Sequence, residues 1–158
     1  MNETQANRLL KLAKYLREKV KPEEFDLGSF SEFVSLDKGK AAEDLCEIRN
    51  RSLSFLDAKT ATPLCGSTAC ALGYATNIWP RRFVLRIEKS RYGNLFCAKT
   101  GKELEFDSPI IQDFFGINGE ECEILFSPDH SRTPAKEADM IEGVVLSQYP
   151  KAVNRDVT

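Results

Sequence analysis

The sequence predicts an α+β fold that is mostly helical, with a small antiparallel β meander inserted around residues 83–106. Apolar residues recur every three or four positions over most of the chain, as in amphipathic helices, and alternate with polar residues only near residue 83. The length of 158 residues, of which 42% are hydrophobic and 29% charged, suits one soluble domain. We expect this globular domain to span residues 1–150, with a flexible polar tail at residues 151–158.

Helical spacing predicts the elements of the first third of the chain. A first helix is expected from about Thr4 until Pro22, because proline lacks the N–H group that a helix interior requires. Residues 25–36 have apolar spacing that allows short helical turns, and a second amphipathic pattern covers residues 40–56. We therefore expect a less regular passage with short helical turns, followed by a second helix.

The next helix is expected to begin with Ser67 or Thr68 as its N-cap and to end at Trp79-Pro80. Apolar and polar residues then alternate over residues 83–88, which predicts a strand. Turn-forming residues at 92–94 and 99–102 separate this strand from two shorter apolar runs. The pattern indicates a meander of two or three strands.

Cap and proline signals predict three C-terminal helices. Ser108-Pro109 begins a helix that ends near Gly116, and a short helix follows over residues 120–126. Thr133-Pro134 opens the last helix, with alanine, isoleucine and valine at core spacing.

Residues 63–75 concentrate small residues and cysteines in a turn followed by a helix. Their first interpretation is architectural: Ala69, Gly73 and Thr76 share a helix face, and Cys65 and Cys70 are buried as small apolar side chains. A second interpretation makes Cys65 a nucleophile with His130, the single histidine, as its base. Weaker alternatives are a Cys65–Cys70 redox pair, which lacks the C-x-x-C spacing, and a zinc site, which lacks paired ligands.

A third interpretation is an anion-binding site. Residues 65–68 are expected where a helix N-terminus presents unpaired N–H groups, and Trp79 could stack on a planar ligand. No lysine follows Gly66, so a P-loop for nucleotide hydrolysis is disfavoured. The candidate ligand-binding residues are Cys65, Gly66, Ser67, Thr68, Trp79, Arg81 and Arg82.

Composition disfavours several classes of function. The net charge of −2 lacks the basic excess typical of duplex nucleic-acid binding, and no apolar run approaches the ~20 residues of a membrane span. The polar N-terminus does not resemble a signal peptide, and five cysteines suit a reducing cytoplasm. We expect no resident metal or cofactor, since none of the usual ligand or dinucleotide motifs is present.

The run Cys65-Gly66-Ser67-x-x-Cys70-x-x-Gly73-Tyr74-Ala75 resembles the C-G-[ST]-x-x-C-x-x-G-x-A motif of small uncharacterised proteins of bacteria and their phages. Phe115-Gly116-Ile117 and Leu125-Phe126 are similar to steps that follow the motif in that family. The resemblance implies an intracellular accessory protein, in the host cytoplasm if it is encoded by a phage.

These observations favour binding over catalysis. The leading hypothesis is capture of a nucleotide-like anionic ligand or of a host (defence) protein. The alternatives are a cysteine-dependent enzyme with Cys65 and His130, and an architectural cysteine motif in a protein with a separate interaction face.

Overall fold

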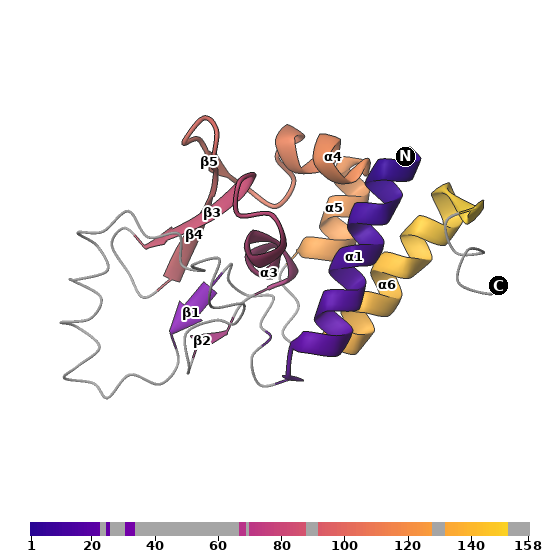
Figure 1. Ribbon diagram of the computed structural model, residues 1–158, viewed down its shortest axis with the longest axis horizontal. Coiled ribbons are helices and arrows are strands. Elements are labelled where there is room, and N and C mark those ends of the chain that lie inside the picture. Colours follow the sequence, from indigo (N-terminus) through magenta and orange to yellow (C-terminus); the bar gives the residue numbers. More distant parts are fainter. Residues whose placement is uncertain are drawn as a thin grey trace.

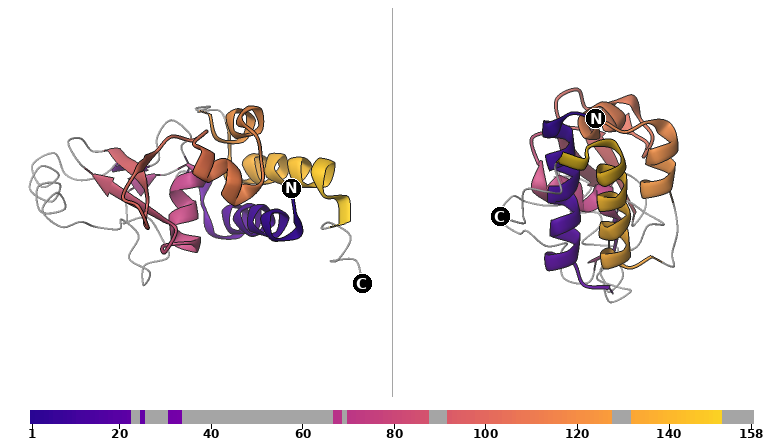
Figure 2. Two further views of the ribbon diagram at one scale, coloured as in Figure 1. Left: turned by 90° about the horizontal axis from the view of Figure 1, so that it is seen from above. Right: turned by 90° about the vertical axis from the view of Figure 1, so that its right-hand side faces the viewer.

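The computed structural model describes residues 1–22, 25, 31–33, 67–68, 70–87, 92–127 and 132–151. A small sheet lies at one end of the molecule and a group of helices at the other, with α3 (Ala71–Ile78) between them (Figure 1). The view from above shows the same division along the long axis (Figure 2). This arrangement confirms the predicted α+β class with mostly helical content.

The sheet contains the predicted meander. Strand β4 (Tyr92–Cys97) pairs with β3 (Phe83–Ile87) and with β5 (Glu103–Leu104), and all pairings are antiparallel. Leu95 of β4 lies opposite Leu85 in one pairing and opposite Leu104 in the other, and all three side chains are buried. Two further strands, β1 (Ser31–Phe33) and β2 (Ser67–Thr68), extend the sheet in the order β2-β1-β4-β3.

Three local expectations are wrong. Residues 92–94, expected to form a turn, belong to strand β4. Residues 31–33 form a strand instead of a helical turn, and Ser67-Thr68 form a strand instead of an N-cap. The N-cap of α3 is Cys70. Strands β1 and β2 pair with strands that are distant in sequence, and such pairing overrides local propensity. The helix expected at residues 40–56, and the expected flexible tail beyond Lys151, lie outside the described residues.

Four helices begin at residues that are typical of helix N-termini. Helix α1 (Glu3–Lys19) has a capping box between Asn2 and Gln5, and α5 (Gly119–Phe126) has one between Asn118 and Glu121. Proline stands at the first position of α4 (Pro109–Phe115) and of α6 (Pro134–Gln148). In α6, Ala138, Ile141 and Val145 are buried as expected, whereas Ala135 is exposed.

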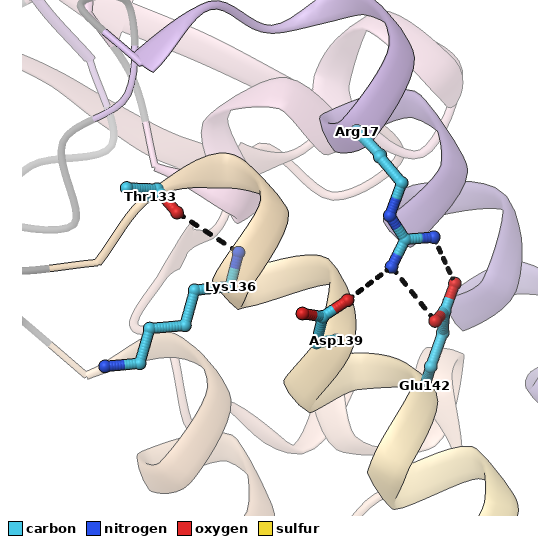
Figure 3. A network of polar contacts seen from close by, with 5 residues as sticks. All are labelled: Arg17, Thr133, Lys136, Asp139 and Glu142. Carbon is cyan, nitrogen blue, oxygen red and sulfur yellow. Dashed lines mark hydrogen bonds and ion pairs between the residues drawn. The ribbon is translucent and has the colours of Figure 1, made fainter.

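Helix α1 packs against α3, α4 and α6, and α6 runs beside it in the opposite direction (Figure 1). Arg17 of α1 joins the two helices, donating to Glu142 at 2.6 Å and to Asp139 at 2.7 Å (Figure 3). These groups are at least 39% exposed, so the ion pairs contribute little stability. The buried apolar side chains between α1 and α6 therefore hold the pair together.

Gly116 ends α4 in the left-handed conformation, with φ of +68°. It lies against Gln5, whose side chain caps α1 and donates to the carbonyl of Asp113 at 2.8 Å. A Cβ atom at Gly116 would meet the Gln5 Cβ atom at 2.9 Å as well as the Gln5 amide. Gly116 thus permits both the turn after α4 and the close approach of α1.

Gly116→Ala is expected to destabilise the protein more than Gly101→Ala. Both glycines have positive φ, so each substitution costs about 1 kcal/mol of backbone strain. Only Gly116→Ala also displaces Gln5, which adds about 1 to 2 kcal/mol through the lost cap and hydrogen bond. Urea unfolding of both variants measures the difference, and equal losses would contradict the proposed contact.

Candidate ligand-binding site

The strongest candidate site lies where α3 ends. Trp79 is the C-cap of α3, and its N–H donates to the carbonyl of Ala75 at 2.9 Å. The carbonyl of Trp79 then accepts the N–H groups of Arg82 and Phe83, at 2.9 and 3.0 Å. Pro80 cannot donate a hydrogen bond, so the helix stops and the chain turns into β3. Trp79 and Arg82 are thereby held in one tight turn.

An open pocket of about 350 Å³ lies on this turn. Its lining is formed by five consecutive residues, Ile78, Trp79, Pro80, Arg81 and Arg82. The volume falls at the lower end of the range of small-ligand sites. Apolar residues from the helix end and two arginines from the turn therefore border the same space.

Aromatic packing fixes the Trp79 side of the pocket. The Trp79 ring meets Phe114 and Phe115 edge to face, with centroids 5.2 and 5.7 Å away. Phe83, the first residue of β3, packs on Phe114 at 4.9 Å. These ring contacts hold Trp79 in place. The residue as a whole is only partly buried, so part of its surface stays exposed.

The two arginines of the pocket differ in their surroundings. Arg81 is exposed, whereas Arg82 is partly buried, with its Cζ atom 5.6 Å from the centroid of Phe114. The buried Nε atom of Arg82 has no hydrogen-bond partner. Within the described ranges, neither arginine forms an ion pair. A buried donor of a charged group without an acceptor is costly to the folded state.

Arg8 of α1 adds a third positive charge near this end of α3. Its Cζ atom lies 4.1 Å from the centroid of Phe114, and its Nη1 atom donates to the carbonyl of Phe114 at 2.8 Å. The same phenyl ring thus contacts the guanidinium groups of Arg8 and Arg82. Three arginines therefore lie near this end of α3, although the whole chain carries a net charge of −2.

The structure separates the described members of the site expected from sequence. Ser67 and Thr68 lie in β2, three strands away from β3 and so about 14 Å across the sheet. The turn at Trp79, Arg81 and Arg82 directly precedes β3. Cys65, Gly66 and His130 lie outside the described residues, so their interpretation as nucleophile, anion nest or base stays a prediction.

Cys70 at the start of α3 is buried, as the architectural interpretation expects. Burial raises the pKa of Cys70 to about 12, and burial likewise raises the pKa of Cys122 to about 12. Both thiols are therefore protonated near neutral pH and unsuited to nucleophilic attack. Cys70 has no partner for a disulfide among the described cysteines.

Cys97 differs from these two thiols, and sequence reasoning missed it. It ends β4, and a hydrogen bond from the Thr100 side chain lowers the pKa of Cys97. Burial opposes this effect, while the backbone amides of Thr100 and Lys99 and the charge of Arg82 add to it. The sequence signal was a cysteine followed by a Lys-Thr-Gly turn, in which N–H groups can face the sulfur.

A buried ion pair was also missed. Glu137 of α6 is fully buried and accepts from Nη1 of Arg132 at 3.0 Å. The same nitrogen donates to the carbonyl of Ile124 at 2.7 Å, at the end of α5. Arg132 therefore ties the end of α5 to the first turns of α6, which indicates a structural role.

The described part of the chain was searched for metal-ligand groups and for membrane-spanning helices. No group of three or more histidine, cysteine, aspartate or glutamate side chains there could hold a metal ion. None of its helices combines the length and the apolar character that crossing a bilayer requires.

Comparison with protein-family models, curated proteins and solved structures finds no match to this chain.

Alkaline pH is expected to destabilise the protein partly through Cys70. The pKa of this thiol is raised by folding, so its contribution to stability is complete below pH 9 and is lost as the pH rises from 9.0 toward about 12. Raising the pH by one unit above 9 should lower the free energy of unfolding by about 1 kcal/mol through this thiol. In Cys70→Ala this part of the alkaline loss of stability should be absent. Urea unfolding against pH tests the prediction.

Cys97→Ala is the matched control. Folding lowers the pKa of Cys97, so the contribution of this thiol to stability is lost as the pH falls and not as it rises. This variant should keep the alkaline decline of the wild type. Parallel pH profiles for wild type and Cys70→Ala would contradict the burial of a neutral thiol at this position.

Proposed function

We propose that this protein works by binding, and that the pocket at the end of α3 captures a small anionic ligand of the nucleotide type. A planar group of the ligand would lie on the exposed part of Trp79. Its phosphate would accept hydrogen bonds from Arg81 and Arg82. The resemblance of the cysteine motif supports an accessory role in a bacterium or a phage-infected host cytoplasm.

The observation that carries this proposal is that Arg81 and Arg82 border one pocket together with Trp79, although neither arginine forms an ion pair within the described ranges. A guanidinium group that served only the fold would be expected to have an acidic partner or a carbonyl acceptor, as Arg17 and Arg132 have. Phosphate oxygens match the fork of donors on arginine, and an aromatic ring matches a nucleobase.

Trp79 is the single tryptophan of the chain, so fluorescence excited selectively in tryptophan, and not in the four tyrosines, reports on the pocket. Titration with AMP, ADP, ATP and inorganic phosphate should give a saturable change for at least one nucleotide. Arg81→Gln with Arg82→Gln should weaken that binding by at least about tenfold, because charge-assisted hydrogen bonds are lost.

The matched control is Lys11→Gln with Lys19→Gln, which removes the same charge from exposed positions of α1. It should bind as the wild type does. Circular dichroism verifies that the arginine variant is folded, since Arg82 also packs on Phe114. Unchanged affinity in the folded arginine variant, or no response of the wild type to any of the four anions, would overturn the proposal.

A further inference from the structure

Two side chains of α1 contact the end of α4, which lies beside the start of α1 (Figure 1). Gln5 and Arg8 are three residues apart, so they lie on the same face of α1. Nε2 of Gln5 donates to the carbonyl of Asp113, and Nη1 of Arg8 donates to the carbonyl of Phe114, both at 2.8 Å. Carbonyls in the last turn of a helix lack partners within that helix. The first turns of α1 therefore cap α4.

Arg8 differs from Gln5 because it also contacts an aromatic ring. Its Cζ atom lies 4.1 Å from the centroid of Phe114, whereas the Cζ atom of Arg82 lies 5.6 Å from the same centroid. One guanidinium group thus contacts both the ring and the carbonyl of Phe114. A planar guanidinium group can make a cation–π contact and donate hydrogen bonds at the same time. Arg8 therefore restrains the main chain and the side chain of Phe114 together.

Phe114 connects Arg8 to the pocket, which residues 78–82 line and which Arg8 does not border. The Trp79 ring packs edge to face on Phe114, with the ring centroids 5.2 Å apart. The orientation of Trp79 therefore depends on that of Phe114. Arg82 depends on this ring less, because its guanidinium group lies farther away and its N–H and carbonyl are both hydrogen-bonded.

We infer that Arg8 is a positioning residue of the pocket: by fixing Phe114 it holds the Trp79 ring in place, and it thereby sets the preference for an anion that carries an aromatic base. The inference rests on the proposed function, because it needs a ligand in the pocket. A ring that is already held in place loses less conformational freedom when a base stacks on it. The benefit therefore applies to the base and not to the phosphate.

The first measurement concerns the protein without ligand. Arg8→Met keeps an unbranched apolar side chain but removes the guanidinium group. In this variant the fluorescence anisotropy of Trp79 should fall and its quenching by acrylamide should increase, because Phe114 is no longer restrained. Arg8→Lys keeps a cation that can lie over the ring, so it should return both signals toward those of the wild type.

The second measurement compares two ligands by isothermal titration calorimetry. AMP carries a base, whereas ribose 5-phosphate has the same sugar and phosphate without one. Arg8→Met should weaken the binding of AMP by at least about threefold, which is part of what stacking on an aromatic ring contributes. It should leave the binding of ribose 5-phosphate unchanged, because Arg8 does not border the pocket. Arg8→Lys should recover most of the affinity for AMP.

Gln5→Met is the matched control for a loss of stability. It removes the neighbouring hydrogen bond between α1 and α4, which goes to Asp113 and not to Phe114. This variant should unfold at a lower urea concentration, yet keep the Trp79 anisotropy and both affinities of the wild type. Circular dichroism verifies that each variant is folded. If Arg8→Met does not fold, Arg8→Gln replaces it with the same expected results, since it keeps a donor for the carbonyl but no charge over the ring.

The outcomes separate this inference from the proposed function. Unchanged Trp79 anisotropy and quenching in the folded variant without Arg8 would overturn the inference, whatever the wild type binds. Equal weakening of AMP and ribose 5-phosphate would also overturn it, because Arg8 would then act through its charge alone. Both results would leave the proposed function standing if the wild type binds AMP. If the wild type binds neither compound and none of the other anions, the proposed function and the inference both fail.

Discussion

The contact between the sheet and the helices at Phe114 is the interaction on which the rest of the structure depends. Phe83 brings the start of β3 to this ring, and Trp79 brings the end of α3, both edge to face. A sheet of a few short strands is not stable alone and needs a helix packed against it. Because Phe114 also contacts Arg8 of α1, one side chain joins the sheet, α3, α4 and α1.

The candidate site is a consequence of this packing. The turn between α3 and β3 must be short, since Trp79 and Phe83 pack on the same ring while only three residues separate them. Arg82 is therefore held beside the aromatic cluster, with its guanidinium group over the Phe114 ring, and it also borders the pocket. Function at this position would use a geometry that folding already requires.

Sequence reasoning located the elements whose signals are local. The prolines at the starts of α4 and α6, the glycine that ends α4 and the alternation over β3 all lie within the segments they define. It failed for β1 and β2, because a strand of two or three residues is stabilised by its distant partner and not by its own side chains. The proximity of Trp79, Arg81 and Arg82 could be predicted because they are near neighbours in the chain, whereas the environment of Cys97 depends on a turn geometry that composition does not reveal.

Helix α3 separates Cys70, at its start, from the pocket, at its end. Eight helical residues span about 12 Å, so Cys70 and Trp79, which cap the two ends of α3, lie at least that far apart along the helix. The two ends of α3 then have different chemistry. The first end buries a neutral thiol in the core, and the second exposes an aromatic ring beside two guanidinium groups. Small residues along α3, such as Ala71, Gly73 and Ala75, are buried and let neighbouring elements approach closely. The described part of the motif, Cys70 to Ala75, thus lies in the core beneath the pocket, and the proposed ligand chemistry belongs to the residues that follow it.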